Sequence, residues 1–251
     1  MSTWTLLCCE WRRMRVRAFF WITAAVIVAG MAWEMVLMLG SFLAQQQQLQ
    51  ATGAGIGYTD LVLLPWLALF IVPAILMAPL ATMSTLAGER RHGTLALLLA
   101  SGLSPGRIVL GKYLAALGWS LLVLAMVLVM PAALAFAGAP DWGKLAAAAL
   151  GLALLVATLT AIGVAASAHS AHPALAAAIA LVVSIALLLV NRASLQQGAI
   201  GGVANWLALP THLQPMGRGL VSSADVAWFV IVTALALALA VHRIGQEGER
   251  D

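Results

Sequence analysis

Charged residues are scarce in this sequence of 251 residues, and their scarcity sets its class. Asp, Glu, Lys and Arg make up 9% of the chain, whereas soluble domains contain about 25% of these residues. Hydrophobic residues make up 63%, and the mean hydropathy is +1.01. A water-soluble globular protein is therefore excluded, and the composition predicts an integral membrane protein with almost no soluble portion.

Cysteine is also scarce, and the motifs of hydrolytic and metal-dependent enzymes are absent. Cys8 and Cys9 are adjacent, so they indicate neither a disulfide framework nor a metal site. The sequence has no H-E-x-x-H or G-x-S-x-G motif. His169 and His172 are close enough to share a helix face, but a metal site needs more ligands. We interpret them as a polar turn between two spans. A membrane enzyme that uses them is the weakest functional hypothesis for this chain.

Long apolar stretches, in contrast, are abundant and are separated by short polar breaks. They predict an all-α fold with six transmembrane helices in a single domain at 18–251. The fourth span has small residues four positions apart (Ala147/Gly151 and Gly163/Ser167), which permits close helix packing. The expected spans are residues 18–39, 61–87, 108–136, 145–168, 174–190 and 224–241.

Residues 1–17 precede the first span and have apolar side chains on one helical face. Trp4, Leu7, Trp11 and Met14 recur at intervals of three and four residues. This spacing predicts an amphipathic helix that lies in the membrane interface, and a disordered basic leader is the alternative. The apolar run that follows is too long for the core of a signal peptide, so we predict a retained first span.

Two polar segments are expected on the outer side of the membrane. Residues 40–60 contain a run of glutamines and no Lys or Arg. Residues 191–223 are too polar to span but contain apolar pieces. This segment is predicted to be external, with one or two short re-entrant or interfacial helices.

The basic residues predict the orientation of the spans. Most Lys and Arg residues lie near the N-terminus, between the second and third spans, and in the C-terminal tail; the exceptions are Lys144, Arg192 and Arg218. The positive-inside rule then places both termini and the hairpin at 88–106 in the cytoplasm. The net charge of +4 is thus a signal of topology, and nucleic acid is not an expected partner.

The hairpin contains an apolar segment that is too short to span. Residues 94–100 would rise only about 10 Å as a helix. A short apolar helix between charged flanks is expected to lie at the membrane surface and dock onto a partner, because each fully buried leucine contributes about 1.5–3 kcal/mol. The simpler interpretation, an ordinary interhelical loop, gives no reason to display leucines.

The start of the third span matches part of a nucleotide-binding motif. Gly106 to Lys112 fits most of G-x-x-x-x-G-K-[ST], but Tyr113 stands where a Ser or Thr hydroxyl would hold Mg²⁺. No strand is expected before this segment. We therefore predict that the chain does not hydrolyse ATP.

Three residues inside the spans suggest mechanistic roles. Glu34 is the only acid expected within a span, at a depth of about 22 Å. It is a candidate for a substrate path, or for a buried ion pair with Arg218 or Arg192. Pro73 and Pro79 interrupt the second span, and we predict a hinge there.

The hairpin also carries the most specific pattern of the chain. Glu89, Arg90, Arg91, His92, Gly93, Thr94 and Leu95 are followed by Leu97–Leu99, Pro105, Gly111 and Lys112. This order resembles the cytoplasmic hairpin of ABC type-2 transporter permeases, with its E-x-x-x-G-T-L start, leucine centre, proline break and G-K pair. Glu10 and the segment 210–228 resemble further parts of that family, so the resemblance covers the whole chain. Within the family, the chain is most similar to the short permeases of gliding motility and nitrous-oxide-reductase maturation.

The resemblance implies a non-catalytic permease subunit of an ABC transporter in the cell membrane, with the bacterial inner membrane expected. Two cytoplasmic ATPase subunits would bind ATP and Mg²⁺, a second permease copy or a related chain would complete the transporter, and this chain would bind no cofactor. ATP-driven closure would open the permease outward to export an unidentified substrate. The alternative is a mechanical transducer that moves periplasmic or envelope partners. The residues expected to contact the ATPase are Glu89, Arg90, Arg91, His92, Gly93, Thr94, Leu95, Leu97, Leu98 and Leu99.

Overall fold

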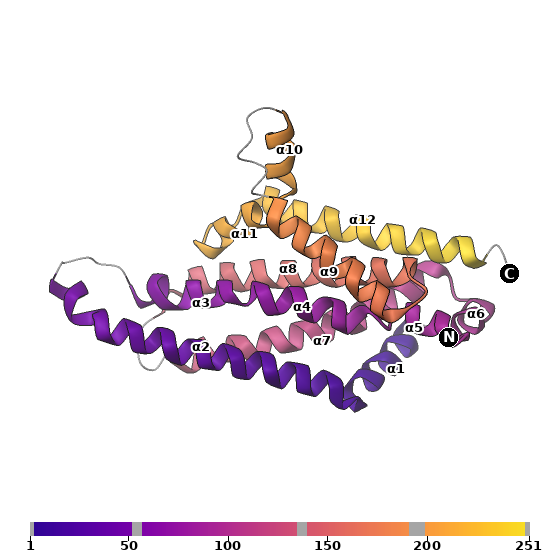
Figure 1. Cartoon of the computed structure of the whole chain (residues 1–251), viewed down its shortest axis with the longest axis horizontal. Coiled ribbons are helices and arrows are strands. Elements are labelled where there is room, and N and C mark those ends of the chain that lie inside the picture. Colours follow the sequence, from indigo (N-terminus) through magenta and orange to yellow (C-terminus); the bar gives the residue numbers. More distant parts are fainter. Residues whose placement is uncertain (1–2, 52–56, 135–139, 191–198, 249–251) are drawn as a thin grey trace.

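The computed structural model describes residues 3–51, 57–134, 140–190 and 199–248, and this part of the chain consists of helices without strands (Figure 1). Five helical segments are long and apolar enough to cross a membrane, and one further apolar helix is shorter. The predicted all-α membrane fold is confirmed. The elements are α1 (Thr3–Val16), α2 (Ala18–Ala51), the π-helical turn η1 (Thr59–Leu63), α3 (Leu64–Leu69), α4 (Ile71–Thr82), α5 (Ala87–Arg91), α6 (Thr94–Ala100), α7 (Pro105–Leu134), α8 (Trp142–His169), α9 (Pro173–Leu189), α10 (Ala199–Leu207), α11 (Leu209–Gly217) and α12 (Ser223–Gly248).

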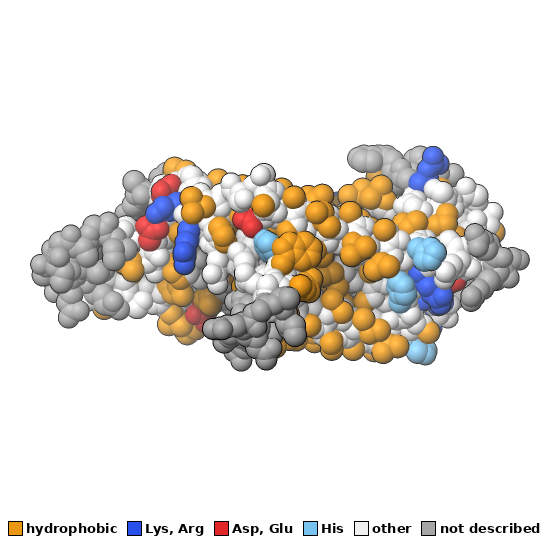
Figure 2. Space-filling view, turned by 90° about the horizontal axis from the view of Figure 1, so that it is seen from above, with side chains coloured by type: hydrophobic (Ala, Val, Ile, Leu, Met, Phe, Trp, Pro, Cys, Tyr) orange, Lys and Arg blue, Asp and Glu red, His pale blue; other side chains and the backbone are white. Residues whose placement is uncertain are grey.

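The long helices lie side by side along the length of the molecule (Figure 1). α5 and α6 lie at one end, near α1 and the last turns of α12, whereas α3 and α11 lie towards the other end. The short helix α10 stands out from the side of the bundle. Figure 2 shows a mainly hydrophobic middle section, with Lys and Arg side chains near both ends. This distribution fits a bundle whose middle lies in hydrocarbon.

α8 is the central helix, and it packs against α4, α7, α9, α11 and α12. Its small residues allow the neighbouring helices to approach closely, as predicted. At Gly151, for example, an added Cβ would lie 3.1 Å from atoms of Leu213 and Met216 in α11. The close fit of α8 to its neighbours therefore depends on positions that lack a side chain.

α2 extends beyond the predicted end of the first span. A loop was expected from residue 40, but the helix continues to Ala51, so this boundary was wrong. A single glycine such as Gly40 costs only about 1 kcal/mol in a helix, and the glutamines that follow are good helix formers. Polar composition marks the end of the apolar span, but by itself it does not end a helix.

The fifth predicted span corresponds to α9. Its 17 residues rise about 25 Å, which is less than the roughly 30 Å of membrane hydrocarbon. Within the described residues, the structure therefore has five long spans and one short apolar helix where six spans were predicted. The polar segment that follows contains α10 and α11, and residues 191–198 lie outside the described residues.

The second predicted span is interrupted more than once. It begins as η1 and α3, breaks at Phe70, continues as α4, and resumes as α5 after a turn at 83–86. Pro73 explains the break at Phe70, because proline has no N–H for the Leu69 carbonyl and its ring crowds that carbonyl. Pro79 lies inside α4 and does not end it.

Candidate functional site

Two glycines frame the short apolar helix α6. Gly93 follows α5 and Gly102 follows α6, and both have left-handed φ angles, of 71° and 76°. This conformation is disfavoured for residues with a Cβ, so glycine suits both helix ends. The N–H of Gly93 donates to the Arg90 carbonyl, and that of Gly102 donates to the Leu99 carbonyl. α6 is thus a separate segment held between two tight turns.

The leucines of α6 face in two directions. Leu95 is 4% exposed and lies in one hydrophobic cluster with residues of α7 and α12, so it belongs to the core and is not displayed as expected. Leu97 is 71% exposed. Leu98 and Leu99 are half-buried against the same cluster as Leu95. The apolar surface open to a partner is therefore centred on Leu97.

A charge network connects α5 to α1 and α7. The Lys112 ammonium lies 2.7 Å from Glu89 Oε1 and 2.9 Å from Glu10 Oε1, and the Lys112 side chain is 1% exposed. Arg13 adds a second cation, 3.8 Å from Glu10 and from Glu89. The negative charges of the two glutamates are balanced by the positive charges of Lys112 and Arg13. Their attraction offsets the free-energy cost of removing the charges from water. The start of the hairpin is therefore fixed to the N-terminal helix and to the third span.

Arg90 connects α5 to the ends of α8 and α12. Its guanidinium donates to the carbonyl oxygens of Ala168, at 2.7 Å, and of Ser170. It also donates to both carboxylate oxygens of Glu247, at 2.7 and 3.0 Å. The last carbonyls of a helix lack intrahelical partners and carry partial negative charge, and the guanidinium supplies a donor for that of Ala168 in the last turn of α8. Three helix ends thereby meet at one side chain.

Ser167 of α8 closes the break between α4 and α5. Its hydroxyl oxygen accepts hydrogen bonds from the N–H groups of Leu86, at 3.1 Å, and Ala87, at 3.0 Å. Its O–H donates to the Met83 carbonyl at 3.2 Å. The first N–H groups of a helix have no intrahelical acceptor, and here another helix supplies one. Ser167 therefore fixes where α5 begins.

The remaining hairpin residues expected at the ATPase contact, Arg91, His92 and Thr94, are exposed. His92 Nδ1 lies 2.6 Å from the Gly88 carbonyl oxygen. The Thr94 hydroxyl donates to the Glu89 carbonyl at 3.3 Å. These local contacts order the turn between α5 and α6 while leaving its outer face free.

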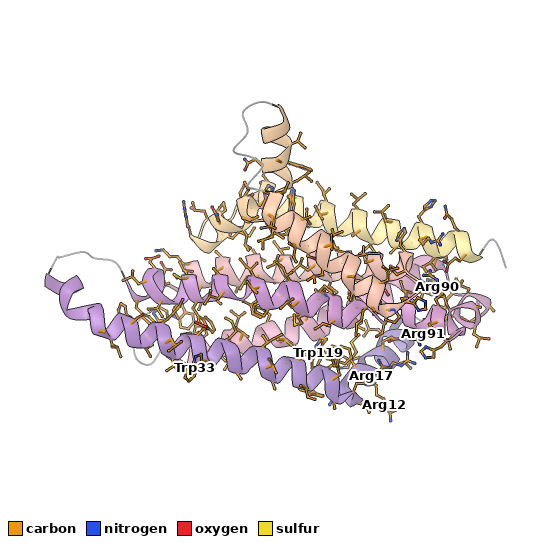
Figure 3. All side chains as sticks on the ribbon, viewed as in Figure 1. Arg12, Arg17, Trp33, Arg90, Arg91 and Trp119 are labelled. Carbon is orange, nitrogen blue, oxygen red and sulfur yellow. The ribbon has the colours of Figure 1, made fainter. Side chains whose placement is uncertain are left out.

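Basic side chains gather at the end of the bundle that carries the hairpin. Figure 3 shows Arg90 and Arg91 of α5 at the same end as Arg12 and Arg17, which lie near the junction of α1 and α2. This is the end that the positive-inside rule predicts to face the cytoplasm.

The segment 106–113, which matches part of a nucleotide-binding motif, has a different role in the structure. Gly106 to Tyr113 lie within α7, and the Lys112 ammonium is paired with Glu89 and Glu10. A phosphate-binding loop needs that ammonium available to phosphate, and it follows a strand. The match to the pattern is therefore incidental.

Glu34 and Arg218, which the sequence suggested as an ion pair, lie in different grooves. Glu34 is exposed in a groove between α2 and α3–α4. Arg218 directly follows α11 and lines another groove, together with Asp60 and Lys144. The other suggested partner, Arg192, lies outside the described residues. The structure thus does not pair Glu34 with Arg218, and a substrate path that includes Glu34 stays a prediction.

His169 and His172 lie at the turn between α8 and α9. His169 ends α8, and its Nδ1 lies 2.9 Å from the Ala165 carbonyl oxygen. His172 immediately precedes the first residue of α9. Across the described ranges, no group of three or more His, Cys, Asp or Glu side chains is placed to hold a metal ion.

Comparison with known families identifies the chain as a whole. A family model described as ABC-2 family transporter protein matches residues 4–243. The chain belongs to the ABC-2 transporter family. No curated protein matches it significantly. The match is to the family as a whole, so the similarity to gliding-motility and nitrous-oxide-reductase permeases stays a prediction.

Family membership makes this ABC-2 protein a multi-pass membrane protein and a permease subunit of an ABC transporter. Such membrane subunits work with ABC ATPases. In this permease, the hairpin contacts several helices of the bundle. Glu89 contacts α7, Arg90 contacts α12, and Leu95 packs against residues of both.

Several residues that hold the hairpin of this permease were missed by sequence reasoning. Glu247 was read as part of a charged tail, and Ser167 only as a small residue for helix packing. A usable signal was present for Lys112, because a lysine inside an apolar span needs an acidic partner. No local pattern shows which acid that partner is.

Proposed function

We propose that this permease receives the work of ATP hydrolysis from a cytoplasmic ABC ATPase through α6, and that it drives export or translocation of a substrate. Two permease chains and two ATPase subunits would form the transporter in a bacterial inner membrane. ATP and Mg²⁺ would bind to the ATPases, and both termini and the hairpin would lie in the cytoplasm.

The observation that carries this proposal is the exposure of Leu97 on a helix that is otherwise anchored. Leu97 is 71% exposed, whereas Leu95, on the same helix, is 4% exposed. Burying an exposed leucine in a partner's groove contributes about 1.5–3 kcal/mol. Arg91 and His92, which precede α6 in the same hairpin and are exposed, can add polar contacts at the rim of such an interface.

The contacts of the hairpin give the route by which a push on α6 would spread. Glu89 and Lys112 lead to α1 and α7, and Arg90 leads to α8 and α12. Ser167 joins the same region to the turn after α4. Because these contacts are short and largely buried, a displacement of α6 would be transmitted to the spans rather than absorbed by the hairpin.

The test is co-expression with the cognate ATPase, followed by pull-down of the complex. Leu97→Asp places a charge on the proposed contact without touching the core. Leu220→Asp is the matched control, because Leu220 is 66% exposed and lies after α11, away from the hairpin. We expect Leu97→Asp to lower ATPase recovery about tenfold or more, and Leu220→Asp to leave it unchanged. Undiminished recovery with Leu97→Asp would contradict the proposal.

A further inference from the structure

A second site lies at the end of the bundle away from the hairpin. A cavity of about 640 Å³ opens between α3, α8, α9 and α11. This volume is in the range of small-molecule binding sites, about 300–1,000 Å³. Most of its wall is apolar and is formed by Leu64, Leu67, Ala68, Ile71, Leu152 and Leu188.

The charged residues that line this cavity, Asp60, Lys144 and Arg218, have a formal net charge of +1. Lys144 donates to both carboxylate oxygens of Asp60, at 2.7 and 2.8 Å, so these two charges balance. Arg218 also lines the cavity and is exposed, and it has no ion-pair partner among the residues that the structure describes. The neighbouring Asp141 accepts from the N–H groups at the start of α8, where the helix end carries partial positive charge. The guanidinium of Arg218 is therefore the charge left over at the rim.

The backbone fixes the place of Arg218. α11 ends in a Schellman turn, in which the N–H of Leu220 donates to the Pro215 carbonyl and that of Gly219 to the Met216 carbonyl. Gly219 has a left-handed φ of 87°, and a Cβ there would lie 2.9 Å from the Lys144 side chain. Glycine is thus needed for the turn and for the close approach to Lys144. The backbone turn at 215–220 therefore places Arg218 next to Gly219, which approaches Lys144 closely.

The cavity has one charged end and one apolar end, aligned with the spans. Lys144 lies near the start of α8, and Leu152 lies about 12 Å further along the same helix, towards its middle. A span begins close to Asp60 as well. The rim therefore lies where a span meets the head-group layer, and the apolar wall continues towards the hydrocarbon.

We propose that this cavity binds one anionic phospholipid of the membrane. Its phosphate would accept hydrogen bonds from the Arg218 guanidinium, which suits phosphate geometry. An acyl chain would lie along Leu64, Ala68 and Leu152. A lipid without a phosphate would gain the same apolar contacts but would leave the rim charge without a partner, and a zwitterionic lipid would bring its own ammonium group close to Lys144 and Arg218, where like charges repel. The site is independent of the hairpin and of ATPase binding.

The test is native mass spectrometry of the purified, delipidated permease with added phosphatidylglycerol or phosphatidylcholine. Ala68→Trp fills the cavity from an exposed wall position, and Leu69→Trp is its control because Leu69 faces the groove on the other side. Arg218→Gln removes the charge, and Arg107→Gln is its control at the hairpin end. We expect tight retention of one phosphatidylglycerol by the native chain and loss of that lipid in Ala68→Trp. In Arg218→Gln, affinity should fall about tenfold, as for one lost charge-assisted hydrogen bond.

Two results would overturn the proposal. One is equal retention of both lipids by the native chain. The other is a pattern in which Ala68→Trp and Arg218→Gln retain phosphatidylglycerol as well as their controls do. Arg218 is exposed, so its variant is expected to fold, and it keeps the test decisive even where the tryptophan variant does not fold.

Discussion

Gly163 of α8 and Thr82 of α4 lie so close that no side chain fits between them. A Cβ added at position 163 would come within 2.1 Å of the Thr82 hydroxyl oxygen and 3.0 Å of its Cβ. That hydroxyl donates to the Ala78 carbonyl at 2.7 Å, which holds it in place. Gly163 lies one helical turn before Ser167, so this contact sets the distance between α4 and α8 at the point where Ser167 caps α5.

Gly163→Ala should therefore destabilise the permease by about 1–3 kcal/mol, the usual range for overpacking a core. Combining it with Thr82→Ala should recover part of the loss, because the hydroxyl is removed while the Cβ at 3.0 Å remains. Thermal unfolding in detergent measures both effects. A Gly163→Ala protein as stable as the native chain would show that α4 and α8 separate without cost.

Ser167→Ala should leave the N–H groups of Leu86 and Ala87 without their acceptor. Each unsatisfied buried donor costs about 1–3 kcal/mol, so α5 should fray and the stimulation of the ATPase by the permease should fall. The control is Ser120→Ala, because Ser120 is equally buried but its hydroxyl donates to the Ala116 carbonyl of its own helix. Equal effects of the two variants on ATPase stimulation would contradict a specific role for Ser167.

Lys112→Met should be among the most damaging single changes. It leaves Glu89 and Glu10 buried near each other with only Arg13 to offset them, and breaking such a group costs about 3–5 kcal/mol. Glu10→Gln should cost less, because the pair of Lys112 and Glu89 survives.

The triple variant Glu10→Gln, Glu89→Gln and Lys112→Met is the informative comparison for this network. Because the only charge of the network that remains is that of Arg13, whose side chain is 56% exposed to solvent, the triple variant should regain most of the stability lost in Lys112→Met. The measurement is the unfolding midpoint of each purified variant. A triple variant less stable than Lys112→Met alone would mean that the charges act independently.

Gly93→Ala should misplace α6 through the backbone alone. The site has open space, since nothing lies within 4 Å of an added Cβ, and the strain comes from the left-handed φ, at about 1–2 kcal/mol. Gly93→Asn should be milder, because asparagine visits this conformation more readily. We expect ATPase stimulation to fall in the order native, Asn, Ala. Gly202→Ala, at an open position inside α10, should have no effect on stimulation.

The proposed hinge in the second span is tested by restoring helix-forming residues. Pro73→Ala supplies the missing N–H for the Leu69 carbonyl and should allow α3 and α4 to join across Phe70. Together with Pro79→Ala, it should stiffen the span and reduce transport more than it reduces ATPase binding. If both transport and ATPase stimulation stay at native levels in the double variant, the hinge is not where we place it.

The sequence was sufficient for those parts of the fold that depend on local composition. Apolar length predicts where α7, α8 and α12 run, and the hairpin motif predicts α6 to the residue. The end of α2 was not predictable from polarity, because glutamine is too polar for the membrane interior but is still a good helix former. The break at Phe70 follows from Pro73, but the turn at 83–86 depends on Ser167, a residue of another helix.

The charge network was beyond prediction for the same physical reason. Glu10, Glu89 and Lys112 are far apart in sequence, and no periodicity connects them. Their pairing is set by how α1, α5 and α7 pack. The direction of Leu95 likewise depends on α12, which contributes Ile244 to the cluster that receives it. Local pattern identified the hairpin, and tertiary packing decided which of its side chains are available.

The contact of Arg90 with Glu247 matters for how this protein is purified and labelled. The Glu247 carboxylate in the last turn of α12 accepts the hydrogen bond of the Arg90 guanidinium. A truncation just before Glu247 would therefore remove a contact of the hairpin together with what looks like a dispensable tail. A detection tag fused directly to Gly248 would lie next to the same turn. A long flexible spacer, or a tag carried by the cognate ATPase, would let binding assays report on the native contact.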